Sequence, residues 1–119
     1  MRILLVDDEE EFVSTLAERL TIRGIDAEWT LTGLDAIRRA ESKSFDLAVL
    51  DLKIPKMGGL DLKNKLQLTC PDMKFIFLTG YGSEKDFRAV SNQVGEDFYL
   101  VKPLDIDVLI GKMNTLMKD

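Results

Sequence analysis

The 119-residue chain contains no histidine, and this absence excludes several kinds of chemistry. Without imidazole, the chain has no His-based catalytic triad, no histidine-rich zinc site and no phosphohistidine of its own. The motif G-x-x-x-x-G-K-[ST] is also missing, so no P-loop for ATP is predicted. The single cysteine, Cys70, cannot form an internal disulfide, which favours the reducing cytoplasm as the location.

Long apolar runs are missing as well. No stretch approaches the roughly 18 apolar residues of a membrane-spanning helix, and the chain begins with a strand-like run rather than a signal peptide. We therefore expect no membrane contact. The net charge of −5, part of it in the acidic run at residues 7–11, argues against direct nucleic-acid binding through phosphate contacts.

The remaining composition, 45% hydrophobic and 31% charged, is that of one globular domain spanning residues 1–119. Short apolar runs alternate with segments of helical period. The strand-like runs cover residues 3–6, 26–30, 47–50, 75–78 and 98–101. The helical segments cover residues 12–20, 34–40, 60–68, 83–95 and 106–116. Five βα units in succession predict an α/β fold with a doubly wound parallel sheet and helices on both faces.

Four of the five apolar runs end at a polar residue with distinct chemistry. In chain order these ends are Asp7-Asp8, Asp51, Thr79 and Lys102. Ligands of open α/β sheets bind beyond the carboxyl ends of the strands. If the strands lie side by side, three carboxylates, a hydroxyl and an ammonium meet in one crevice, and this set suits a divalent cation and a phosphoryl group.

The sequence around these ends resembles a known family. The motifs are Leu4-Leu5-Val6-Asp7-Asp8-Glu9, the segment 50–59 with Asp51 and Pro55, Leu78-Thr79-Gly80-Tyr81-Gly82, and Tyr99-Leu100-Val101-Lys102-Pro103. In this order and spacing they resemble the response-regulator receiver domain of two-component signalling, over essentially the whole chain. The resemblance implies a flavodoxin-like (βα)5 fold, with five parallel strands in the order 2-1-3-4-5.

By this resemblance, Asp51 is the phosphoacceptor. It would take a phosphoryl group from the phosphohistidine of a sensor histidine kinase or a histidine phosphotransfer protein. Asp7, Asp8, Asp51 and the backbone carbonyl of Lys53 would hold the required Mg²⁺, with Mn²⁺ as a substitute.

The resemblance also assigns the other strand ends. Lys102 would pair with a phosphoryl oxygen, and the Gly80 N–H would donate to the same group. The Thr79 hydroxyl would move toward the phosphoryl group, and the ring of Tyr99 would follow. This switch would alter the face formed by the fourth helix, fifth strand and fifth helix, where an effector domain or a second copy binds. The bond before Pro103 is expected to be cis.

Two alternatives stay open at this stage. A phosphatase working through an aspartyl phosphate would need an acid two residues after Asp51, and Lys53 stands there instead. We therefore expect slow self-hydrolysis and no turnover of a separate substrate. The other alternative is a pseudo-receiver that acts only as an interaction module. Each of these residues also has a purely structural interpretation. Tyr99 could simply pack at the edge of the sheet, and Asp7 or Asp8 could cap a helix.

Three further expectations concern variable positions. Gly58 stands where an acidic residue is common in the family, which affects the stiffness of its loop. Phe87 and the polar segment 91–94 affect the choice of partner, and Lys53 and Tyr81 occupy the positions that set the lifetime of the acyl phosphate.

Overall fold

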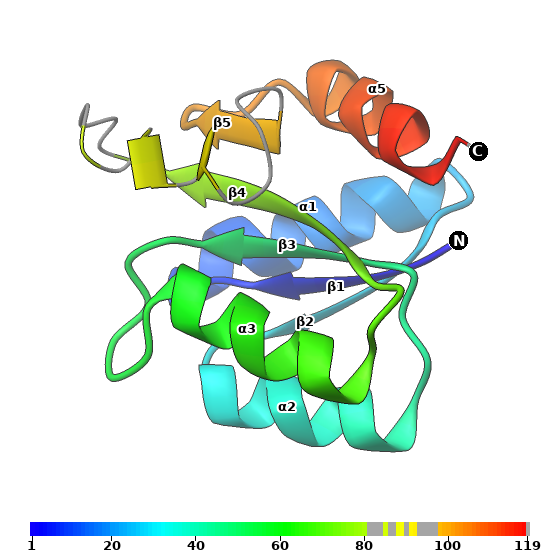
Figure 1. Cartoon of the computed structure of the whole chain (residues 1–119). Coiled ribbons are helices and arrows are strands. Elements are labelled where there is room, and N and C mark those ends of the chain that lie inside the picture. Colours follow the sequence, from blue (N-terminus) through cyan, green and yellow to red (C-terminus); the bar gives the residue numbers. More distant parts are fainter. Residues whose placement is uncertain (81–84, 86–87, 90, 93–97, 119) are drawn as a thin grey trace.

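Five parallel strands lie side by side in the order β2-β1-β3-β4-β5, and their carboxyl ends lie at one edge of the sheet (Figure 1). The computed structural model describes residues 1–80, 85, 88–89, 91–92 and 98–118. The strands are β1 (Arg2–Val6), β2 (Asp26–Thr30), β3 (Leu47–Asp51), β4 (Lys74–Thr79) and β5 (Tyr99–Val101). Their order and direction confirm the predicted doubly wound sheet.

Helices cover both faces of the sheet. They are α1 (Glu10–Ile22), α2 (Gly33–Ser42), α3 (Gly59–Thr69) and α5 (Ile106–Met117). Figure 1 shows α2 and α3 on one face and α1 and α5 on the other. Alternate residues of β1 supply the two cores: Leu4 and Val6 pack with α2 and α3, whereas Ile3 and Leu5 pack with α1 and α5. Both faces of the strand are buried, which is why its sequence is continuously apolar.

Local signals fix several helix ends. The Thr32 hydroxyl accepts a hydrogen bond from the Asp35 N–H (3.1 Å) at the start of α2, and Asp105 caps α5 by accepting from the Asp107 N–H (2.8 Å). Side-chain oxygens at these positions satisfy N–H groups that have no partner within the helix. After α1, Gly24 takes a positive φ of 84°, which glycine adopts without strain. These signals fix where α2 and α5 begin and where α1 ends.

Two residues used to predict the helices are not in the core. Leu34 and Leu68 lie within α2 and α3 but are 55% and 85% exposed. The buried faces of these helices are formed by Ala36, Ala40, Leu62 and Leu66. The spacing of the apolar residues is therefore that of a helix, but these two leucines lie outside the apolar face that packs on the sheet.

The predicted fourth helix falls mostly outside the described residues. Within the predicted segment 83–95, the described residues Lys85, Arg88, Ala89, Ser91 and Asn92 are helical. Both ends of the predicted segment, Ser83 and Gly95, lie outside the described part, as do Tyr81 and Phe87. Within the described residues, none of the helices combines the length and apolar character needed to cross a membrane.

The start of α3 lies directly against the end of β3. The Gly59 N–H donates to the carbonyl of Leu52 (3.0 Å). A Cβ on Gly59 would lie 2.6 Å from the carbonyl oxygen of Asp51 and 3.0 Å from the Cα of Leu52. Because both neighbours are backbone atoms, they cannot turn aside as a flexible side chain could. This close approach requires glycine at position 59, and it packs the start of α3 directly against the backbone of Asp51 and Leu52.

We expect Gly59→Ala to lower the free energy of unfolding by about 1–3 kcal/mol, because the added methyl forces the backbone of β3 and α3 apart. Urea unfolding measures this change. Gly111→Ala in α5 is the matched control, since its Cβ would meet nothing within 4 Å and should stabilise the helix by up to about 1 kcal/mol. Equal urea midpoints for Gly59→Ala and the wild type would contradict the close approach.

Candidate metal and phosphoryl site

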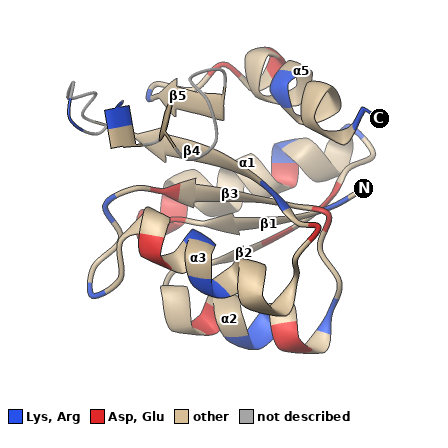
Figure 2. Cartoon of the chain, in the orientation of Figure 1, with Lys and Arg blue, Asp and Glu red and all other residues tan. Residues whose placement is uncertain are grey.

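Three carboxylates meet at the carboxyl ends of β1 and β3. Asp7, Asp8 and Asp51 each offer an oxygen, and these oxygens lie within 4.8 Å of one another. Val6 is in register with Leu50, so Asp7 and Asp51 occupy the next positions on neighbouring chain segments. Figure 2 shows acidic residues at the end of β3 and the start of α1. The structure thus brings together the three carboxylates named from the sequence.

The two buried carboxylates are held by backbone N–H groups two residues further along the chain. Asp7 Oδ1 accepts from the Glu9 N–H (2.8 Å), and Asp51 Oδ1 accepts from the Lys53 N–H (2.9 Å). Asp7 is 2% exposed and Asp51 is 6% exposed, whereas Asp8 faces solvent. Such local turns fix the carboxylates, and their second oxygens both contact Lys102.

Lys102 brings a positive charge from the end of β5 into this cluster. Its Nζ lies 2.7 Å from Asp7 Oδ2, 3.3 Å from Asp51 Oδ2 and 2.6 Å from Glu9 Oε1. It also lies 4.4 Å from the centre of the Phe12 ring. The Lys102–Pro103 bond is cis, the isomer that the resemblance implies. An ammonium in contact with two buried carboxylates reduces the repulsion between them.

The carboxylate of Glu9 and the ring of Phe12 were not assigned a role from the sequence. Glu9 occurs in the acidic run and in the first family motif, and Phe12 starts a predicted helical segment. The available signal was their spacing, because residues three apart at the start of a helix lie on the same side. The partner, Lys102, is remote in sequence, so this signal could not identify the contact.

Burial and charge shift the pKa values of this cluster. Burial raises the pKa of Asp7, and the nearby charge of Asp51 adds to that effect, while hydrogen bonds from Lys102 and the Glu9 N–H oppose it. For Lys102, burial alone would lower the pKa. Hydrogen bonds to Asp7 and Glu9, with the charges of Asp7 and Asp51, raise the Lys102 pKa above its usual value instead. Lys102 is therefore charged at neutral pH, and the ionised form of Asp7 costs stability.

Thr79 and Gly80 lie at the carboxyl end of β4, and Tyr99 lies at the start of β5. Thr79 is buried at the end of β4, and its carbonyl accepts from the Lys102 N–H (2.8 Å). Gly80 is exposed, and a Cβ there would meet no atom of the described residues within 4 Å. Tyr99 is in register with Phe77, two residues before Thr79, and packs on the same core cluster as Phe77. Thr79 and Tyr99 therefore lie on the same face of the sheet.

The donor set fits a hard divalent cation. Carboxylate oxygens from three residues lie close enough to share one ion, and one of them, Asp8, faces solvent. Oxygen-only ligands of this kind are typical of Mg²⁺ and Ca²⁺ sites. Lys53 lies two residues after Asp51 with its N–H hydrogen-bonded to that carboxylate. Its carbonyl as a further ligand stays a prediction.

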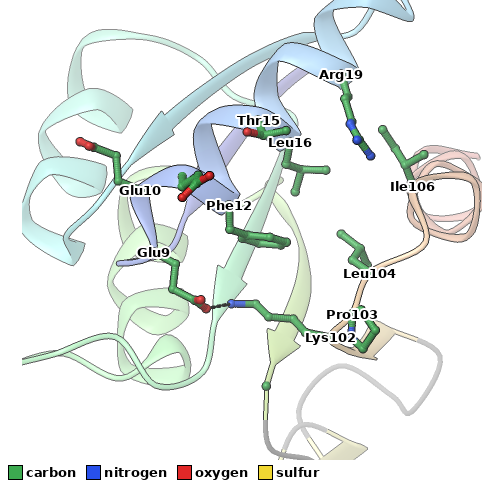
Figure 3. Close-up of a pocket in the computed structure, with 12 residues that line it drawn as sticks. Glu9, Glu10, Phe12, Thr15, Leu16, Arg19, Lys102, Pro103, Leu104 and Ile106 are labelled. Carbon is green, nitrogen blue, oxygen red and sulfur yellow. Dashed lines mark hydrogen bonds and ion pairs between the residues drawn. The ribbon is translucent and has the colours of Figure 1, made fainter.

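A groove of 1030 Å³ opens beside Lys102, between α1 and the segment that joins β5 to α5. Figure 3 shows the side chains of Phe12, Leu16, Leu104 and Ile106 along it. Arg19 lies toward the end of the groove that is remote from Glu9. The groove therefore joins an apolar surface to the acidic cluster.

Comparison with known proteins identifies the family. The model of the response regulator receiver domain matches residues 3–114. The chain therefore belongs to this family, the receiver domains of two-component response regulators.

Curated relatives are longer than this chain. It is 31% identical over 118 residues to the response regulator MprA of Mycobacterium avium (strain 104). It is 30% identical over 118 residues to the transcriptional activator protein IrlR of Burkholderia pseudomallei (strain 1026b). Each alignment covers 99% of this chain and 51% of the relative. The chain spans about half the length of the curated relatives it matches.

Solved structures share the flavodoxin-like fold. A receiver domain protein (CheY-like) from Methanospirillum hungatei JF-1 has 32% identity and a TM-score of 0.85, covering 96% of this chain and 90% of its own. A response regulator protein from Burkholderia pseudomallei has 30% identity and a TM-score of 0.82, covering 93% of this chain and 65% of its own. That crystal structure contains a phosphorylated aspartic acid, a calcium ion and citrate.

We expect Asp7→Asn to raise the free energy of unfolding of the metal-free protein at pH 7. Because folding raises the pKa of Asp7, the wild type loses stability as the pH rises through that pKa, and the variant does not. The gain should fall toward zero as the pH drops below about 4, because Asp7 then becomes protonated in the unfolded as well as the folded state. Urea unfolding in EDTA at the two pH values measures the difference.

Asp72→Asn is the matched control for this experiment, since Asp72 is exposed and lies outside the acidic cluster. It removes the same charge and should leave stability nearly unchanged. A gain for Asp7→Asn that stayed constant down to about pH 3.5 would contradict the role of the raised pKa.

Proposed function

We propose that the protein is a phosphorylation-dependent signalling switch whose phosphoacceptor is Asp51. It would receive the phosphoryl group from a phosphohistidine of a sensor histidine kinase or a histidine phosphotransfer protein. The observation that carries the proposal is the Asp51 carboxylate, buried beside Asp7 and Asp8 with the Lys102 ammonium 3.3 Å away. Asp51 is thus a nucleophile beside carboxylates that can hold a cation, and this cation together with Lys102 would bind an anionic phosphoryl group.

The chemical step is an in-line displacement at phosphorus. A carboxylate oxygen of Asp51 forms a bond to phosphorus while the bond from phosphorus to the imidazole nitrogen breaks. The donor ring, protonated on its other nitrogen, leaves as a neutral histidine, and Asp51 becomes an acyl phosphate. Mg²⁺ bound by Asp7, Asp8, Asp51 and the Lys53 carbonyl would neutralise charge on the phosphoryl oxygens. Lys102, at the carboxyl end of β5, supplies a second positive charge, and the Gly80 N–H is a further donor.

Phosphorylation would then act through Thr79 and Tyr99. The two residues lie on the same face of the sheet, Thr79 at the end of β4 and Tyr99 at the start of β5. Movement of the Thr79 hydroxyl toward the phosphoryl group would leave space for the Tyr99 ring. The neighbouring surface of β5 and α5 carries Val101 and Val108, which are 48% and 47% exposed. We propose that an effector domain or a second copy of the chain binds the face formed by the predicted fourth helix, β5 and α5.

No separate substrate is proposed. A phosphatase of the aspartyl-phosphate type would need an acid at the position of Lys53, and the chain has no histidine to take that role. We expect only slow loss of the phosphoryl group from Asp51. The cytoplasmic location indicated by the lone cysteine, and an output without direct nucleic-acid contact by this domain, are part of the same proposal.

Incubation with Mg²⁺ and a small phosphodonor such as acetyl phosphate should add one phosphoryl group to the wild type, detected by intact mass. Asp51→Asn should abolish the adduct, because it replaces the nucleophile by an amide of the same shape. Chelation of Mg²⁺ should slow the reaction by at least about tenfold. An adduct of equal yield on Asp51→Asn would place the phosphoacceptor elsewhere.

Mg²⁺ should also raise the melting temperature of the protein in a concentration-dependent way. A cation that binds only the folded state stabilises it by about 2.7 kcal/mol at one hundred times its dissociation constant. Asp8→Ala should blunt this rise without loss of stability in EDTA, since Asp8 is exposed. Glu18→Ala, an exposed acid further along α1, is the control and should respond as the wild type does. An unchanged response of Asp8→Ala would contradict the metal site.

A further inference from the structure

Glu9 contacts the phosphoryl-binding lysine but has no part in the function proposed above. Its Oε1 lies 2.6 Å from Lys102 Nζ, the shortest of the three carboxylate contacts that this ammonium makes within the described residues. A lysine ammonium has three N–H donors, and Asp7, Glu9 and Asp51 supply three acceptors. Lys102 is therefore fully paired before any metal or phosphoryl group binds.

The position of Glu9 is fixed by its backbone. Its N–H donates to Asp7 Oδ1 (2.8 Å), and its carbonyl accepts from the Val13 N–H (3.0 Å) in the first turn of α1. Phe12, one turn along, places its ring 4.4 Å from the same ammonium. Figure 3 shows Glu9 and Phe12 directed toward Lys102 from α1 and its N-terminal end. The contact is thus built by the segment that also carries Asp7.

The environments of the three acceptors differ. Asp7 and Asp51 are buried and belong to the carboxylate cluster, whereas the Glu9 side chain is 62% exposed and lies outside that cluster. A divalent cation bound to Asp7 and Asp51 would compete with Lys102 for their oxygens. A phosphoryl group on Asp51 would compete with Glu9 for Lys102. Glu9 is therefore the acceptor that can keep Lys102 at the edge of the cluster.

We propose that Glu9 is a positioning residue that acts through Lys102. It holds the ammonium at the edge of the cluster, which leaves Asp7 and Asp51 to the cation, and it releases the ammonium when a phosphoryl group binds Asp51. The inference rests on the proposed function. It assigns Glu9 two opposite effects, because Glu9 favours cation binding and opposes phosphoryl binding.

Glu9→Gln should weaken Mg²⁺ binding about two- to fivefold, since Lys102 then depends more on Asp7 and Asp51. At saturating Mg²⁺ the same variant should bind beryllofluoride, a tetrahedral mimic of the phosphoryl group, about two- to fivefold more tightly. Both affinities can be measured by calorimetry on the full chain. Because Glu9 is exposed, the variant is expected to fold.

Loss of a negative charge near the pocket would change both affinities in the same directions without any contact to Lys102. Glu10→Gln is the matched control, because Glu10 is adjacent, borders the same groove and points away from Lys102 (Figure 3). Measurements in about 1 M salt, where the Debye length is near 3 Å, suppress the long-range effect. Under these conditions Glu9→Gln should change both affinities and Glu10→Gln neither. Equal changes in the two variants would overturn the proposal.

A double-mutant cycle tests whether Glu9 acts through Lys102. In a Lys102→Met background, Glu9→Gln should change Mg²⁺ affinity no more than Glu10→Gln does. A full Glu9→Gln effect in that background would overturn the positioning role. A wild type that binds Mg²⁺ and beryllofluoride, with no effect of Glu9→Gln, would overturn only this inference. A wild type that binds neither would overturn the proposed function as well.

Discussion

The structure depends most on one interaction, the contact of the Lys102 ammonium with two buried carboxylates. Asp7 and Asp51 lie next to each other at the ends of β1 and β3, where water is largely excluded. Two like charges in such a place repel, and each loses hydration that the protein must replace. Lys102 and the N–H groups of Glu9 and Lys53 supply that replacement. The pKa of Asp7 is nevertheless raised, because these groups only partly compensate for the water that its carboxylate loses on burial.

This incomplete compensation connects the fold to ligand binding. The three charged groups come from β1, β3 and β5, so they meet only when the whole sheet is formed. The close approach of Gly59 to the backbone of Asp51 keeps the end of β3 in place. A site that is short of positive charge while folded binds a cation without a large rearrangement. Binding energy then adds to the stability of the sheet that created the site.

The sequence contained enough to predict the sheet and the residues at its carboxyl edge. Continuous apolar runs mark buried parallel strands, and the residue that ends each run lies at that edge, as Asp7, Asp51, Thr79 and Lys102 do. The contact between Glu9 and Lys102 could not be predicted, because it joins a helix start to a strand end 93 residues away. Leu34 and Leu68 show the same limit in the core, since helical period does not specify which positions face the sheet.

Lys102 also joins the acidic cluster to the residues expected to switch. Its side chain contacts Asp7 and Asp51, while its N–H donates to the carbonyl of Thr79. The backbones of β4 and β5 are therefore tied together at the point where both would meet a phosphoryl group. A ligand that binds both the Lys102 ammonium and the Thr79 hydroxyl would therefore move these side chains while the hydrogen bond between their backbones stays in place. Such a change alters packing near Tyr99 without unpairing the strands, and a coupling of about 1–3 kcal/mol is enough to change the affinity for a partner many-fold.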